Sequence, residues 1–250
     1  MIKFFRKIRQ KLLTENKFSK YLLYTIGEIV LVVIGILIAL SINNWNDDRK
    51  IADQETLYLK RLLSDNKQDY ITFSNFIRDL KKGNETIEQL SKALNTTIND
   101  SLLVVRANEF IEYGSIFPIF SSSKSTFIDL SSTGNLSVIK DFNLRDQIVN
   151  HYAQHDYMQQ RIQISTEWTI PLDGSLYTEN NAMNFETSTA FLYPNTSIKV
   201  LASELRDNKL AYINNIASHH WINSDAIDRF EKLKEQTAKI IDKIEKQLTE

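Results

Sequence analysis

Two histidines one helical turn apart are the side chains whose spacing comes nearest to a chemical site in this sequence. His151 and His155 stand four positions apart, which places both rings on one face of a helix, where they can bind one metal ion. The glutamate of the zinc-enzyme motif HExxH is absent, because Tyr152-Ala153-Gln154 fills the gap. The chain has no cysteine, so further ligands would come from distant carboxylates. We therefore interpret the pair as part of a polar helix face and expect no metal and no cofactor.

Other catalytic arrangements are also missing. His219 and His220 are adjacent, so their rings point about 100° apart on a helix. The six glycines form neither a Gly-x-Ser-x-Gly nucleophile turn nor a glycine-rich phosphate loop. We predict that the protein is not an enzyme, and an enzyme with an unfamiliar site stays a less favoured alternative.

A long apolar segment lies near the N-terminus. Tyr21 to Ile42 reads YLLYTIGEIVLVVIGILIALSI, with Glu28 as its only charge. At 1.5 Å per residue the segment is ~33 Å long, which matches a hydrocarbon core of ~30 Å. Tyr24 near one end and Trp45 just past the other suit the membrane interfaces. The sequence predicts one transmembrane helix over residues 21–42.

The charges on the two sides of this segment differ in sign. Seven of the 30 Lys and Arg residues lie in residues 1–20, against one of the 31 Asp and Glu residues. The positive-inside rule places residues 1–20 in the cytoplasm as a basic head and residues 43–250 across the membrane. The expected partner of the head is the lipid bilayer, as a short helix on anionic lipid or as a plain topology signal, and nucleic acid is not expected.

A cleaved signal peptide is the main alternative for the apolar segment. Ala39-Leu40-Ser41 offers small residues at a spacing that a signal peptidase accepts. The apolar run, however, exceeds the 7–15 residues typical of such a peptide. We therefore favour an uncleaved signal-anchor, and the body is exported under either interpretation.

Two features inside the predicted span indicate a transmembrane interface. Gly27, Gly35 and Ala39 belong to a stripe that recurs every four residues, and Gly35-x-x-x-Ala39 is a small-xxx-small pair that lets helices approach closely. Glu28 is costly in lipid unless it is paired, protonated or turned toward a protein partner. The alternatives are that Gly and Ala are common in spans and that Glu28 reaches water at the cytoplasmic interface.

The body shows helical periodicity along most of its length. We expect an all-α fold in which the transmembrane helix is followed by one extracytoplasmic domain, a bundle of long helices. Residues 101–121 are ambiguous between helix and strand, and 171–197 is read as a connector. The expected helices cover 46–82, 83–94, 125–130, 141–168, 197–221 and 230–248. Pro171 is expected to close the helix over 141–168, and Asn223-Ser224-Asp225 to interrupt the chain after the helix over 197–221. The helix over 230–248 resembles a coiled coil.

Several motifs resemble an uncharacterised family of bacterial single-pass membrane proteins, domain-of-unknown-function family 6090. The resemblance rests on Phe4-Phe5-Arg6, Lys17-Phe18-Ser19-Lys20-Tyr21, Gly27-Glu28 and the run from Gly35 to Trp45. A looser match covers Ser131-Ser132-Thr133-Gly134-Asn135-Leu136, Asp141 and Leu144-Arg145. The resemblance implies a protein of the bacterial inner membrane with an exported, periplasmic helical domain. It implies no activity and no active-site residue.

The function expected from these observations is binding or structural. We interpret the protein as a membrane-anchored helical module of the cell envelope that contacts another envelope membrane protein or itself. A sensor-like domain that binds a ligand and acts through a partner is the alternative, because residues 1–20 are too few for a cytoplasmic output domain.

Overall fold

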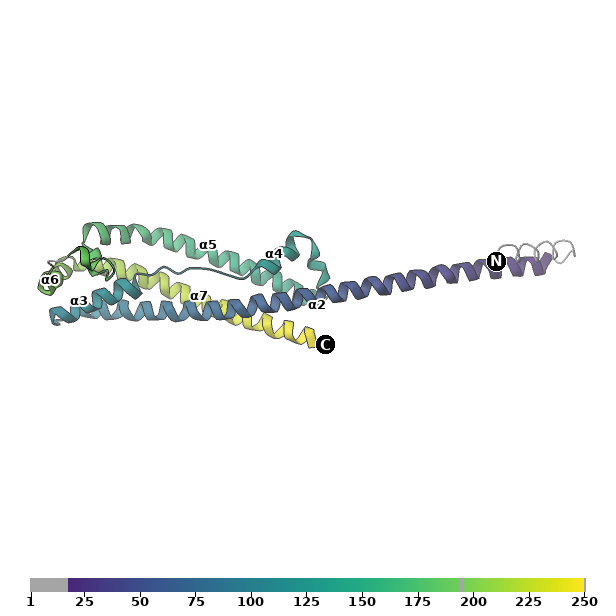
Figure 1. Ribbon diagram of the computed structural model, residues 1–250, viewed down its shortest axis with the longest axis horizontal. Helices are drawn as coiled ribbons and strands as arrows, with labels where there is room; N and C mark the ends of the chain where they lie inside the picture. The colour runs from purple at the N-terminus through teal and green to yellow at the C-terminus, as the bar shows by residue number, and fades with distance from the viewer. Residues whose placement is uncertain (1–17, 194–195, 250) are drawn as a thin grey trace. The chain divides into compact units, whose positions relative to one another are not determined.

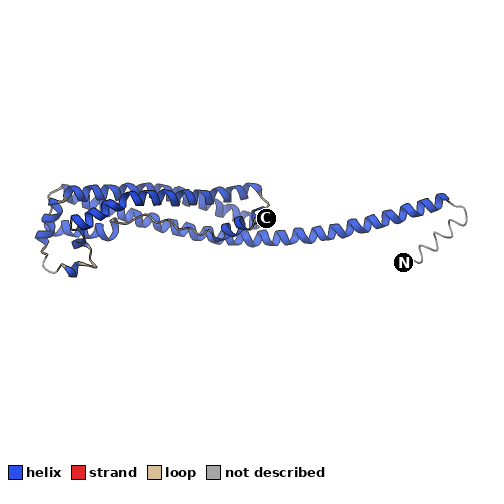
Figure 2. Cartoon of the chain, turned by 90° about the horizontal axis from the view of Figure 1, so that it is seen from above, coloured by secondary structure: helices blue, strands red, loops and turns tan. Residues whose placement is uncertain are grey.

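The described part of the chain is entirely helical apart from turns and irregular connections. The computed structural model describes residues 18–193 and 196–249, and these contain no strand (Figure 2). The all-α prediction is therefore confirmed. The predicted lipid-surface helix of the head falls in residues outside this description. The chain divides into two compact units, Met1–Glu55 and Thr56–Glu250.

In the first unit the described residues belong to the helix α2 (Phe18–Asn95). Its most apolar 18-residue window has a mean hydropathy of 2.6, and no residue of that window is buried. Leu31 and Leu37, for example, are 72% and 56% exposed. The length and composition of this helix allow it to cross a membrane.

The second unit is built on three long helices. Residues 56–95 of α2 lie beside α5 (Phe142–Glu179) and α7 (Lys209–Thr249) (Figure 1). At one end α3 (Asp100–Glu109) packs on α6 (Ile198–Asp207). The shorter elements are the π-helical turn η1 (Phe110–Gly114), α4 (Ser125–Ser132), and the 3-10 turns η2 (Asn135–Val138), η3 (Ala182–Phe185) and η4 (Ala190–Leu192).

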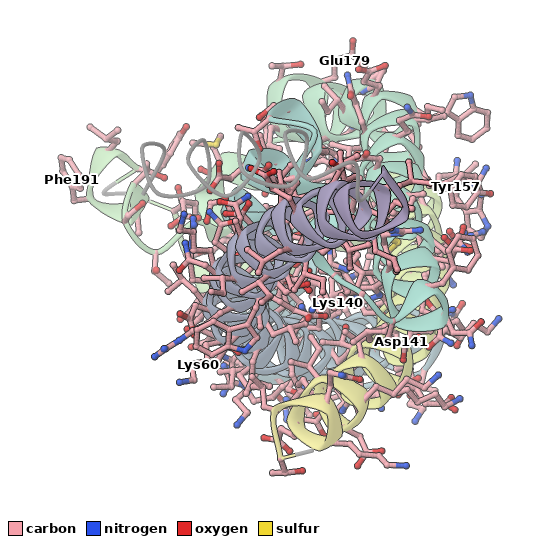
Figure 3. The ribbon with its side chains drawn as sticks, turned by 90° about the vertical axis from the view of Figure 1, so that its right-hand side faces the viewer. Lys60, Lys140, Asp141, Tyr157, Glu179 and Phe191 are labelled. Carbon is pink, nitrogen blue, oxygen red and sulfur yellow. The ribbon has the colours of Figure 1, made fainter. Side chains whose placement is uncertain are left out.

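Three apolar clusters form the core along this unit, and each takes side chains from α2, α5 and α7. The cluster next to α4 includes Leu62, Tyr152 and Ile244. The middle cluster includes Phe73, Met158 and Phe230, and the cluster next to α3 and α6 includes Leu90, Leu176 and Tyr212. Other large side chains, such as Tyr157 and Phe191, point outward (Figure 3).

Two of the predicted helix starts, at residues 141 and 197, are confirmed by their caps. Asp141 accepts hydrogen bonds from the backbone N–H groups of Asn143 at 2.8 Å and Leu144 at 3.2 Å and opens α5. Ser197 accepts one from Val200 at 3.3 Å and opens α6. Such caps satisfy N–H groups that have no partner inside the helix, which is why the signal is readable locally.

The predicted boundary at Gly83 is wrong, because α2 runs through it without a break. A Cβ atom at Gly83 would lie 2.9 Å from the carbonyl oxygen of Tyr113 in η1. The glycine therefore permits a close approach between α2 and η1. The ambiguous residues 101–121 are helical as far as Gly114 and irregular beyond it.

The predicted breaks at Pro171 and at residues 223–225 are also wrong. α5 continues to Glu179, and burial of Leu176 in the core offsets part of the ~3 kcal/mol that an internal proline costs. α7 runs through residues 223–225, because Ile222, Ala226 and Phe230 are buried on one face at a spacing of four. The chain breaks instead at Asn208, between α6 and α7.

Candidate functional site

The four residues predicted for a transmembrane interface lie along α2 in the first unit. An added Cβ at Gly27 or Gly35 would meet nothing within 4 Å, and Ala39 is exposed. Glu28 is half-buried. At 100° per residue, Glu28 and Ala39 fall within about 40° of Gly35, on the same face. The interface at these four residues stays a prediction.

His151 and His155 are not on a polar helix face, and that interpretation is wrong. Both rings are buried, at 4% and 0% exposure. Their Nε2 atoms lie 3.0 Å apart, within hydrogen-bonding distance. The sequence placed the two rings on one face correctly, but only packing against α2 and residues 115–124 determines that this face points inward.

A hydrogen-bonded chain of side chains runs through this buried site. The hydroxyl of Ser122 lies 2.6 Å from His155 Nδ1, so Ser122, His155 and His151 are connected in series. Asp69 of α2 accepts the backbone N–H of Ser123 at 2.6 Å through Oδ1. Its second oxygen, Oδ2, is buried and lies 3.9 Å from His155 Nδ1.

Burial shifts the pKa values of Asp69, His151 and His155 in the direction that favours the neutral form of each group. The pKa of Asp69 rises to about 6, because burial outweighs the lowering by hydrogen bonds from Ser123 and Ser122. The pKa of His151 falls to about 4 through burial. The pKa of His155 falls to about 3 through burial and, to a smaller extent, through His151 and Lys124. Both rings are therefore neutral at pH 7.

A second buried histidine lies near the other end of residues 115–124. His219 is fully buried, and its Nδ1 lies 3.1 Å from the carbonyl oxygen of Ile116. Its Nε2 lies 2.7 Å from Asp173 Oδ1, which also accepts the amide of Asn215 at 2.7 Å. The side chain of His220, next in sequence, is 45% exposed, in agreement with the predicted divergence of the two rings.

The two histidine sites hold the irregular segment 115–124 against the helices. Ile116 is held by His219, whereas Ser122 and Ser123 are held by His155 and Asp69. Between these contacts the ring of Phe120 packs against His155, with centroids 5.7 Å apart. The backbone of this segment forms no regular ladder, so side chains from α2, α5 and α7 supply its partners.

A groove between α5 and α7 adjoins His151. Its volume is about 310 Å³. His151 Nδ1 is buried and has no hydrogen-bond partner. The lining residues are Gln147, Asn150, His151 and Gln154 from α5, and Gln236, Lys239, Ile240 and Lys243 from α7.

Metal ligands are too few in the described residues to make a metal centre. No group of three or more His, Asp or Glu side chains there has the geometry to hold an ion. His151 and His155 would supply two nitrogen ligands, but Asp69 faces the Nδ1 edge of His155 and not its Nε2 edge. Sequence reasoning missed Asp69, Ser122 and Asp173, because no local motif connects them to the histidines.

Comparison with known proteins shows that the chain matches a family to which no activity is assigned. A sequence model described as a family of unknown function, DUF6090, matches residues 28–168, more than half of the chain. No curated protein and no solved structure matches the chain.

Proposed function

We propose that this protein, which belongs to the family of unknown function DUF6090, is a membrane-tethered helical binding module and not an enzyme. The observation that carries the proposal is the unburied apolar stretch of α2 in the first unit. Apolar surface of this extent is stable in lipid or against another protein, and is costly in water. Residues 56–250 form the part available for binding.

The tether is tested by placing charges in the apolar stretch. Leu31→Lys with Leu37→Lys should release the full chain from membranes, because each Lys costs about 3 kcal/mol at the centre of a span. The matched control, Ile119→Lys with Phe191→Lys, changes two exposed apolar residues of the second unit and should stay membrane-bound. The measurement is the fraction retained in the membrane pellet after alkaline washing. Equal retention of both variants would contradict a tether in α2.

The proposed topology places residues 1–20 in the bacterial cytoplasm and residues 43–250 on the far side of the inner membrane. Its support is the basic charge of residues 1–20. The chain has no cysteine, so one introduced cysteine reports on one position. Thr187→Cys should react with a membrane-impermeant maleimide in spheroplasts, and Lys11→Cys only after lysis. The reverse labelling pattern would reject this orientation.

We also propose that the protein associates with itself or with another envelope protein through the face of α2 that carries Gly35 and Ala39. Gly35→Ile with Ala39→Ile should reduce association in membranes, because the larger side chains keep helix backbones apart. Val33→Ile with Leu37→Ile alters the opposite face of the helix and serves as the control. Association is measured by cross-linking of the full chain in native membranes. If both variants associate as the unmodified chain does, the small-residue face is not an interface.

A further inference from the structure

Segment 115–124 connects η1 to α4 without regular secondary structure (Figure 1). Near α4, Asp69 accepts the backbone N–H of Ser123 at 2.6 Å. The hydroxyl of Ser122 lies 2.6 Å from His155 Nδ1. Most residues of the segment are half-buried, whereas Asp69 and His155 beneath it are fully buried. Detaching these few residues disrupts less packing than unfolding a long helix, so the segment can open locally.

The hydrogen bonds around His155 run in one direction. Ser122 donates to Asp69, so its oxygen accepts from His155 Nδ1–H. His155 Nε2 is then a lone pair, which accepts from His151 Nε2–H. His151 Nδ1 is also a lone pair, buried and without a hydrogen-bond partner among the described residues. Each ring therefore carries one proton, and the contact between the two rings holds one proton.

A further proton on either ring meets no acceptor while the segment is in place. On His155 Nε2 it would face the N–H of His151 across 3.0 Å. On His151 Nδ1 it would be buried beside a groove lined by the cations Lys239 and Lys243. The other base nearby is Asp69 Oδ2, 3.9 Å from His155 Nδ1, and a protonated carboxyl accepts hydrogen bonds less strongly than a carboxylate.

Other charged groups around this cluster support the same order of events. Asp65 of α2 accepts the N–H of Thr126 and favours protonation of Asp69. Lys124, in an exposed pair with Asp156, opposes protonation of His155. Acid therefore first weakens the acceptor that holds Ser123 and then adds charge to the buried rings.

The other end of the segment has a different set of partners. His219 lies 3.1 Å from the carbonyl oxygen of Ile116 and 2.7 Å from a carboxylate oxygen of Asp173. Both oxygens are acceptors, so a proton on either ring nitrogen meets one of them. Acid therefore leaves the contact between His219 and the segment in place.

We propose that segment 115–124 is an acid-released strap, in which residues 119–124 leave the long helices on acidification while the part bound to His219 stays in place. Water then reaches the cluster beneath the strap and solvates its protonated groups. Phe120 separates from the ring of Phe73, to which it is stacked with centroids 5.9 Å apart. Opening thus uncovers the middle core cluster in acid.

Hydrogen exchange of the full chain in detergent, measured by mass spectrometry at residue resolution at pH 7 and 4.5, tests the strap. Two amides report on its ends: Ser123 N–H, bound by Asp69, and Ser115 N–H, which donates to the carbonyl of Phe110 at 2.7 Å. At pH 4.5 the protection factor of Ser123 should fall by about tenfold or more, while those of Ser115 and of Phe230 in α7 change by less than about threefold. Equal loss at both ends, an equal loss at Phe230, or unchanged protection of Ser123 would overturn the proposal.

The variant His151→Gln tests whether the ring pair is responsible. The carboxamide oxygen of Gln accepts from His155 Nε2–H, so His155 can be charged with its hydrogen bonds intact, and the loss at Ser123 should shrink by about threefold or more. His220→Gln changes a histidine that is 45% exposed and should open as the unmodified chain does. Equal opening of the two variants would overturn the role of the ring pair. If His151→Gln already lowers protection at pH 7, the ratio of Ser123 to Ser115 in the unmodified chain decides.

Discussion

The two buried histidine sites of the second unit hold their imidazole rings with different hydrogen-bond partners. His155 faces a hydroxyl and a second imidazole, which can each donate or accept, and burial keeps it neutral. His219 faces a carbonyl oxygen and a carboxyl oxygen that already accepts an amide. The contacts of His219 are therefore oxygen acceptors, whereas each contact of His155 can donate or accept. The same residue type is thus held by a hydroxyl and an imidazole at one end of segment 115–124 and by a carbonyl and a carboxylate at the other.

The largest expected effect comes from removing the carboxylate that faces His219. Asp173→Asn should lower the free energy of unfolding by about 1.5–3 kcal/mol, because the buried ring of His219 and the amide of Asn215 lose a carboxylate acceptor. Asp156→Asn, in the exposed pair with Lys124, should cost about 1 kcal/mol at most. Urea unfolding of the full chain in detergent, followed by circular dichroism, measures both. Equal losses would mean that the carboxylate of Asp173 contributes no more to stability than an exposed ion pair does.

Acidification should act mainly on the site that contains His151 and His155. The pKa values of His151 and His155 are lowered on folding, so the unfolded chain binds more protons between about pH 6.5 and 4. Each histidine then removes ~1.4 kcal/mol of stability per pH unit as the pH falls through this window. Asp69 has a raised pKa of about 6, so it adds stability as the pH falls from about 6 to 3.8, which offsets one histidine.

The net effect of these opposing contributions on the free energy of unfolding is testable. The unmodified chain should lose stability as the pH falls from 6.5 to 4, at a net ~1.4 kcal/mol per pH unit below pH 6. The double variant His151→Gln with His155→Gln should lose this slope, and the opposite slope of Asp69 should then appear. His219→Gln serves as the comparison for a histidine outside this site. An unchanged slope in the double variant would contradict neutral burial of the pair.

A glycine fixes the end of segment 115–124 that His219 holds. A Cβ at Gly114 would lie 2.5 Å from Phe110 Cδ2 and 2.6 Å from Thr86 Oγ1. Gly114→Ala should therefore cost about 1–3 kcal/mol through overpacking. Gly174→Ala, on α5 with open space around the added atom, should be neutral or stabilising by up to about 1 kcal/mol. Thermal unfolding of both variants separates steric crowding from helix propensity.

The smallest expected effect concerns the hydroxyl that faces His155. Ser122→Ala removes one hydrogen bond and should cost about 1 kcal/mol, whereas Ser121→Ala, at an exposed position, should cost almost nothing. Urea unfolding of the two variants at pH 7 provides the measurement. A loss as large as that of Asp173→Asn would show that the two histidine sites are held equally strongly, against the comparison above.

The sequence by itself determined the features that depend on local chemistry. The apolar stretch of residues 21–42, the all-α class and the helix starts at Asp141 and Ser197 were readable, because hydrophobic period and capping act within a few residues. The adjacent rings of His219 and His220 were also separated correctly by helix geometry.

Only the tertiary structure decided what happens where a local signal competes with packing. Gly83, Pro171 and Asn223 are typical helix breakers, yet each lies inside a helix, because buried neighbours on both sides favour continuity. The burial of His151 and His155 depends on Asp69 and Ser122, which are distant in sequence. A side chain's spacing fixes its face on a helix, but the faces of the other helices fix whether it meets water or core.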